Sequence, residues 1–280
     1  MKLTEFIRQQ KKLVIFGMIV IIIALTAVMA PQITHYDPIK ASLKDALQAP
    51  GAEHLFGTDT LGRDIFTRVI FGTRVSLTST LILLGIVLVT GSFLGIIAGF
   101  FGGFIDTIIM RIADIMIAFP DMILAIAIAG ILGPNLVNSI TAIAIVSWPR
   151  YARLSRSLVL KIKNRDYIYA AYITGSKNEY LLKEYFLPNI LPNLIVTAAT
   201  DVGTFMLSLA SLSFLGFGVQ PPTPEWGYML SEGRQYMQAA PWLMIFPGLA
   251  IFIVVSVFNL FGDSVRDLYN PKSTVNKIIK

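Results

Sequence analysis

Residues 75–100 read VSLTSTLILLGIVLVTGSFLGIIAGF, a run that contains no charged side chain. A helix needs about 20 consecutive apolar residues to cross the hydrocarbon core of a bilayer, so this run is long enough to span a membrane. Its glycines at positions 85, 91, 95 and 99 include four-residue spacings. Small residues spaced in this way let two helices approach closely in lipid. We therefore predict a membrane-spanning helix with one face packed tightly against a neighbour.

The rest of the chain is apolar in the same way. Hydrophobic residues make up 55% of its 280 residues and charged residues 14%, whereas a soluble domain carries roughly 25% charged residues. Five further apolar runs occur, at residues 13–30, 107–131, 136–148 (with a helical extension towards 158), 190–215 and 242–261. Pro120 lies inside the run at 107–131 and should kink or break that helix. The sequence thus predicts an all-α, polytopic membrane protein with six transmembrane helices.

The distribution of charge predicts how these helices are oriented. Basic residues precede the first run at positions 2, 8, 11 and 12, and eight basic residues against three acidic ones lie between 150 and 185. Such positive segments stay in the cytoplasm. The segment 31–74 balances five basic with five acidic residues, which suits the outer side. We expect both termini to be cytoplasmic. The first run could also be a cleaved signal peptide, but its length favours a retained anchor.

Several kinds of chemistry are excluded or disfavoured. The chain has no cysteine, which excludes disulfides, thiolate metal sites and cysteine nucleophiles. Its two histidines, His35 and His54, make a poor metal site and are expected on the surface, so no metal site is predicted. The net charge of +6 is assigned to cytoplasmic loops rather than to a nucleic-acid partner. No phosphate-binding loop of the G-x-x-x-x-G-K-[ST] kind occurs, so the chain is not expected to bind ATP.

A polar insert interrupts this apolar chain between the fourth and fifth runs. Residues 166–172 can form a short helix with Tyr169, Ala170 and Ala171 on its surface. Gly175 then breaks that helix, as a glycine near a helix C-terminus does. A second helical stretch at 178–186 is expected to stop before Pro188. Two short helices joined by a glycine bend make a compact knob, which would fit a groove on another protein.

The insert resembles the EAA loop of the permeases of ATP-binding-cassette (ABC) importers. That pattern places Glu-Ala-Ala, a glycine, an apolar position and Leu-Pro at fixed spacing. The matching residues here, all in register, are Tyr169, Ala170, Ala171, Gly175, Tyr185, Leu187 and Pro188. Asp166, at the start of the first short helix, is also expected to belong to the coupling loop. Tyr169 replaces the usual glutamate, and Tyr185 stands where many relatives have histidine or isoleucine. Residues 54–77, 212–230 and 240–267 resemble further signatures of the dipeptide, oligopeptide and nickel permeases, of the C-type.

This resemblance implies an architecture, a set of partners and a location. The fold is that of a type I ABC-importer permease in the cytoplasmic (inner) membrane of a bacterium or archaeon. Residues 1–73 form the anchor helix and an extracytoplasmic segment, 74–271 the permease core with a coupling loop at 150–189, and 272–280 a cytoplasmic tail. The expected partners are a B-type permease, two ATP-binding subunits, an extracytoplasmic substrate-binding protein and the lipid bilayer. ATP and magnesium are used by the ATPases, so the chain itself is expected to be neither an enzyme nor a cofactor-binding protein.

A polar stripe in the fifth run is the candidate translocation pathway. Steps of four, three, four and three residues place its members on one face of a helix. The stripe consists of Thr197, Asp201, Thr204, Ser208 and Ser211. A carboxylate in a membrane span usually faces a water-filled cavity or a partner, although such a stripe also packs helices through hydrogen bonds. Asp114 either pairs with Arg111 or faces the same cavity, and Asp121 lies towards the outer half.

The outer segment before the last run is a candidate docking surface for a binding protein. The residues in question are Pro221, Pro222, Glu225 and Trp226. Packing over the mouth of the pathway is an equally good interpretation. The cargo also stays open between short peptides and nickel or a metal chelate. The alternative function is an ion-coupled secondary transporter or channel that acts alone, which would need coupling carboxylates and often an internal repeat.

Overall fold

The computed structural model describes residues 11–269. The predictions about positions 2 and 8 and about the tail at 272–280 therefore lie outside the described residues. Within residues 11–269 the chain is helical and forms no strand beyond an isolated bridge between Thr58 and Asp64. The helices are α2 (Lys11–Val28), α3 (Ala30–Ile33), α4 (Ile65–Phe101), α5 (Gly103–Ile117), α6 (Asp121–Leu132), α7 (Leu136–Lys163), α8 (Asp166–Ile173), α9 (Asn178–Leu181), α10 (Leu187–Phe214), α11 (Trp226–Gly233) and α12 (Trp242–Tyr269).

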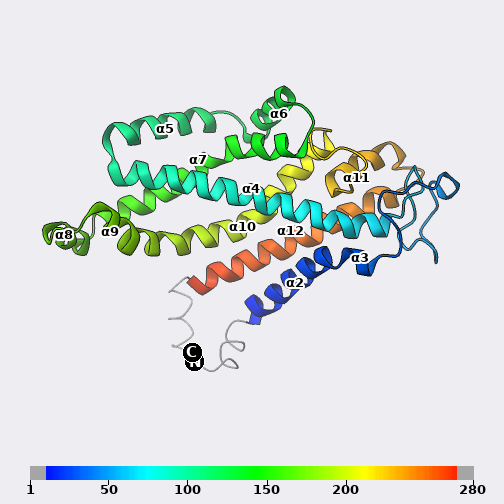
Figure 1. The fold of residues 1–280 in the computed structure, drawn as a ribbon, viewed down its shortest axis with the longest axis horizontal. Coiled ribbons are helices and arrows are strands. Elements are labelled where there is room, and N and C mark those ends of the chain that lie inside the picture. Colours follow the sequence, from blue (N-terminus) through cyan, green and yellow to red (C-terminus); the bar gives the residue numbers. More distant parts are fainter. Residues whose placement is uncertain (1–10, 270–280) are drawn as a thin grey trace.

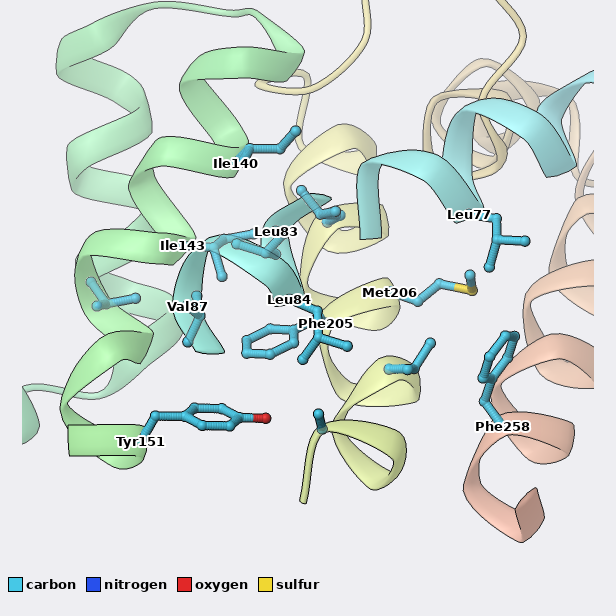
Figure 2. Close-up of a cluster of buried hydrophobic side chains, with 14 of the residues drawn as sticks. Leu77, Leu83, Leu84, Val87, Ile140, Ile143, Tyr151, Phe205, Met206 and Phe258 are labelled. Atoms are coloured by element: carbon cyan, nitrogen blue, oxygen red, sulfur yellow. The ribbon is translucent and has the colours of Figure 1, made fainter. Parts of the chain in front are cut away.

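The long helices α4, α7, α10 and α12 run side by side along the length of the molecule (Figure 1). Helices α8 and α9 lie at one end of this bundle, and α3 and α11 lie at the other. Helix α2 packs against α12 and α4. The core between the long helices is built from side chains such as Leu83, Ile143, Phe205 and Phe258 (Figure 2). The prediction of an all-α, polytopic architecture is confirmed.

Helix α4 contains the apolar run at residues 75–100. It starts where the Asp64 carboxylate accepts a hydrogen bond from the backbone N–H of Thr67 at 2.7 Å, which caps the first turn. Its 37 residues extend for about 55 Å, well beyond the roughly 30 Å of a bilayer core. The predicted close approach occurs against α7. Gly91 faces the backbone of Trp148, Gly95 that of Ala152, and Gly99 the side chain of Val159.

The third apolar run is broken where the sequence predicted. Helices α5 and α6 meet at an angle of 92°, with Pro120 as the N-cap residue of α6. Among residues 11–269, four helices are long and apolar enough to cross a membrane, or five if this bent pair counts as one span. Helix α7 is 28 residues long, but its basic C-terminal half lowers its average hydropathy. The prediction of six spans therefore stays a prediction.

One predicted helix boundary is wrong. The second helix of the polar insert does not stop before Pro188, because α9, a π-helical turn at Leu182–Phe186 and α10 follow one another as one helix over 178–214. In the π turn the N–H of Leu187 donates to the carbonyl of Leu182, five residues back. Pro188 directly follows this π turn, so the continuous helix tolerates the proline at a point where its hydrogen-bond pattern already changes.

Candidate functional site

Helices α6, α7 and α10, together with the end of α5, enclose a cavity of about 430 Å³. Three charged side chains line it: Asp121 at the start of α6, and Arg150 and Arg153 on α7. Hydroxyl groups come from Ser147, Thr204 and Ser208, and the remaining wall is apolar. The cavity is thus a mostly apolar space whose wall also carries hydroxyl groups and charges of both signs.

Three arginines on α7, each three residues from the next, form ion pairs with the neighbouring helices. Arg150 Nη2 lies 3.1 Å from Asp201 Oδ1 on α10. On α5, Asp114 Oδ1 lies 2.6 Å from Arg153 Nη2, and Asp106 accepts two hydrogen bonds from Arg156 at 2.5 and 2.6 Å. The residue that faces Asp114 is therefore Arg153, 39 positions along the chain, rather than the neighbouring Arg111.

The predicted stripe on α10 does not act as one surface. Asp201 is buried, and its Oδ2 accepts a hydrogen bond from the Tyr151 hydroxyl at 2.9 Å. Thr204 and Ser208 line the cavity, whereas Ser211 lines an adjacent space of about 470 Å³ between α6, α10 and α12. Thr197 lies outside both spaces and donates its hydroxyl hydrogen to the carbonyl of Asn193. The stripe thus divides between a helix-packing part and a cavity-lining part.

Sequence reasoning missed the two arginines at the heart of this site. Arg150 and Arg153 count among the basic residues that predict a cytoplasmic loop, yet both side chains reach the cavity. Asp121 was placed in the outer half and set aside, but the bend at Pro120 brings it to the same space. The available signal was the three-residue spacing of arginines on a helix that continues out of an apolar run.

The predicted knob exists as α8 and α9, joined by Gly175 with φ of +81°. Ile168 and Leu181 are fully buried and fix the knob to the bundle. Tyr169 and Ala170 are exposed as expected, whereas Ala171 is buried. Its expected place on the knob surface is therefore wrong, because a helix that packs on one side must turn some of its residues inwards. Tyr185 is half-buried.

The exposed residues of α8 are largely apolar or aromatic, whereas α9 and the turn that follows it also expose charged side chains. Tyr169, Tyr172 and Tyr180 are exposed, and Ile173 is 87% exposed, among the highest values for a large hydrophobic side chain in the described part of the chain. Contiguous exposed apolar side chains on a surface that faces solvent mark sites of protein contact. Leu187 is half-buried and Pro188 exposed, so both continue the knob surface onto α10.

The outer segment packs differently from the docking surface that the sequence suggested. Pro221 and Pro222 are exposed, but Glu225 and Trp226 are buried. Trp226 donates its indole N–H to the carbonyl of Val69 at 2.9 Å. The Glu225 carboxylate caps α11 by accepting from the N–H groups of residues 227 and 228. The burial of these two side chains favours the alternative interpretation, in which they pack the outer segment against the bundle, and docking of a binding protein stays a prediction.

Ionised and titratable groups hold this outer segment together. Burial raises the pKa of Glu225, although hydrogen bonds from two backbone N–H groups and from the hydroxyls of Ser76 and Ser213 act in the opposite direction. Arg63 and Arg68 are buried and both contact the carboxylates of Asp59 and Glu232. His54, which was expected at the surface, is buried with its Nδ1 2.9 Å from Asp64 Oδ1. The segment that precedes α4 is thereby fastened to α11.

Comparisons with known proteins agree with this architecture. Residues 91–275 match the family model of the binding-protein-dependent transport system inner membrane component. The dipeptide transport system permease protein DppC of Alkalihalophilus pseudofirmus is 47% identical over 265 residues, which cover 94% of this chain and 87% of the relative. The nickel transport system permease protein NikC of Escherichia coli is 42% identical over 253 residues, covering 90% and 91%.

A solved structure shares the fold. A chain of the methionine ABC transporter MetNI, in an inward-facing conformation, superposes with a TM-score of 0.60 at 19% identity and covers 74% of this chain and 98% of its own. The resemblance that the polar insert suggested is confirmed, and the chain is a multi-pass membrane protein. It belongs to the family of binding-protein-dependent transport system inner membrane components.

Proposed function

We propose that this chain is the permease subunit of an ATP-driven importer and forms half of a path for short peptides or for nickel or a metal chelate. The relatives named for dipeptide and nickel transport support these two kinds of cargo. The proposed location is the cytoplasmic membrane of a bacterium or archaeon, with six spans and both termini inside. Asp114, Thr204 and Ser208 face or border the path, together with the cavity arginines.

The proposed partners divide the remaining work. A B-type permease supplies the other half of the path, and two ATP-binding subunits bind and hydrolyse ATP with magnesium. The chain itself is proposed to have no enzymatic activity and to bind no cofactor. A separate binding protein delivers cargo to the outer end, where Pro221 and Pro222 are the exposed candidates for contact.

The observation that carries the proposal is the knob and its connection to the cavity. Its apolar face, centred on Ile173, suits a groove on an ATP-binding subunit. Residues 178–214 form one helix from the knob to the cavity-lining Thr204 and Ser208. Because the 37 residues extend for about 55 Å as a continuous helix, a displacement of the knob reaches the cavity without an intervening loop.

The test is uptake by the whole complex purified with its ATP-binding subunits and reconstituted into proteoliposomes. ATP is supplied on the ATPase side, and uptake of a labelled dipeptide and of nickel is measured with the binding protein present. We expect uptake to stop when the phosphate-loop lysine of the ATP-binding subunits is changed to alanine, and to persist when an ionophore collapses ion gradients. Uptake that survives the inactive ATPase but is abolished by the ionophore would instead identify a secondary transporter.

A further inference from the structure

The cavity between α6, α7 and α10 presents both positive and negative charge to the same space. The side chains of Arg150 and Arg153 are 64% and 47% exposed, although both residues lie on a helix in the middle of the bundle. Asp121 is also exposed on the cavity wall. Small-molecule sites are mostly apolar clefts in which a few placed charged or polar groups fix the ligand, and this cavity has that composition.

The ion pairs of these arginines leave much of their hydrogen-bonding capacity free. Within residues 11–269, Arg150 contacts Asp201, and Arg153 contacts Asp114, through one terminal nitrogen each. A guanidinium carries five N–H donors in a planar fork that matches a carboxylate. Asp121 has neither an ion pair nor a side-chain hydrogen bond within the same range of residues. The site therefore offers donors to an anion and an acceptor to a cation.

The size and the polarity of the space narrow the class of ligand. Its volume of about 430 Å³ falls within the roughly 300–1,000 Å³ of small-molecule sites. Phe205, Ile143 and Val146 supply apolar wall between the charged groups. A small zwitterion with an apolar body, such as a dipeptide, matches the volume, the apolar wall and the two signs of charge.

We propose that this cavity is a transit subsite for zwitterionic cargo, in which Arg150 and Arg153 receive a carboxylate and Asp121 receives an ammonium group. The inference rests on the proposed function and specifies the residues that the cargo meets. It also assigns the arginines to the cargo rather than to the docking of an ATPase.

The resting partners of the arginines are suited to exchange. Asp114 and Arg153 are both about half exposed, and exposed ion pairs contribute about 0–1 kcal/mol, so a cargo carboxylate displaces Asp114 at little cost. Asp201 is buried, but Tyr151 continues to donate a hydrogen bond to it when Arg150 turns towards cargo. Arg153 is therefore the better residue to change, because its loss leaves no buried carboxylate unpaired.

The experiment measures equilibrium binding to the permease and ATPase complex in nanodiscs without the binding protein. Saturation-transfer NMR compares L-alanyl-L-alanine, its C-terminal amide and its N-acetyl derivative as probes. Charge-assisted hydrogen bonds to the carboxylate should make the complex bind the free peptide about tenfold more tightly than the amide. Arg153→Gln should lose most of the preference for the free peptide over the amide, because only Arg150 then remains to contact the carboxylate. Asp121→Asn should lose the preference for the free peptide over the N-acetyl derivative. Arg150→Lys keeps the charge but loses the planar fork of N–H donors, so its preference for the free peptide should lie between that of the unmodified complex and that of Arg153→Gln.

Arg156→Gln is the matched control, because Arg156 lies one turn further along α7, pairs with Asp106 and does not line the cavity. It should bind the probes as the unmodified complex does. Size-exclusion elution and ATP hydrolysis establish that each variant complex is assembled. The proposal is overturned if the unmodified complex binds none of the three probes, if it binds the free peptide and the amide alike, or if Arg153→Gln keeps the full preference for the free peptide. None of these results would contradict ATP-driven uptake, so the proposed function would not be affected.

Discussion

The contact between α4 and α7 at Gly95 makes a sharp prediction about stability. The Cβ of an alanine at position 95 would lie 2.8 Å from the Cα of Ala152 and closer still to its carbonyl oxygen. Backbone atoms of a packed helix cannot rotate away as a flexible side chain can. Gly85 is the matched control, because it lies on the same helix and a Cβ there meets nothing within 4 Å.

The magnitude follows from this geometry. Carbon atoms pack at about 3.5–4.0 Å, so α4 and α7 would have to separate by about 1 Å, and a gap of that size forfeits a quarter to a half of each contact's energy. Overpacking of this kind costs about 1–3 kcal/mol. Both substitutions gain about 0.8–1.0 kcal/mol of helix propensity. That gain cancels in the comparison, so Gly95→Ala should be about 2 kcal/mol less stable than Gly85→Ala.

The assay is thermal unfolding of the purified complex in mild detergent, followed by the loss of monodisperse protein. A difference of about 2 kcal/mol corresponds to a midpoint about 4–8 °C lower for Gly95→Ala than for Gly85→Ala, if a chain of this size follows the usual scaling. Equal midpoints for the two variants would refute the reasoning, because they would mean that α7 moves without cost or that the two helices are not in contact.

Two further predictions concern the knob and the outer segment. Gly175 has φ of +81° with open space around it, so a side chain there meets backbone strain rather than a neighbouring atom. Gly175→Val should lose most ATP-dependent uptake through backbone strain of about 1–2 kcal/mol, whereas Gly175→Asn should keep it because asparagine tolerates this conformation. Equal uptake by the two variants would count against the strained bend. Because burial raises the pKa of Glu225, the folded state holds that proton more tightly than the unfolded one, and stability is lost as the pH rises from about 4.3 through the folded-state pKa. The thermal midpoint of the unmodified protein should therefore fall more than that of Glu225→Gln as the pH is raised above about 4.3, and parallel curves for the two proteins would disprove the assignment.

The elements that local sequence specifies were predicted well. The apolar runs, the break at Pro120 and the bend at Gly175 follow from length, hydropathy and backbone restrictions that act within a few residues. The glycine spacing also predicted the close face of α4, although it did not distinguish Gly91, Gly95 and Gly99, which meet α7, from Gly85, which does not.

The pairing of charged side chains could not be predicted in the same way. Local spacing offered Arg111 as a partner for Asp114, but α7 brings Arg153 to it from 39 residues away. The sequence left docking and packing as equally good interpretations of Glu225 and Trp226, and the structure shows both side chains buried, with Trp226 donating a hydrogen bond to α4. A polar or aromatic residue is consistent with either environment, and the choice between them depends on which helix lies opposite.

The sequence by itself determined that this chain is a helical membrane protein with a basic insert that resembles the EAA loop. It could do so because membrane insertion and helix termination depend on the properties of neighbouring residues. Only the tertiary structure decided that Asp201 is buried against Tyr151 and that Asp121, Arg150 and Arg153 share one cavity. The physical reason is that a low-dielectric interior requires charges to find partners, and those partners come from whichever helices pack together.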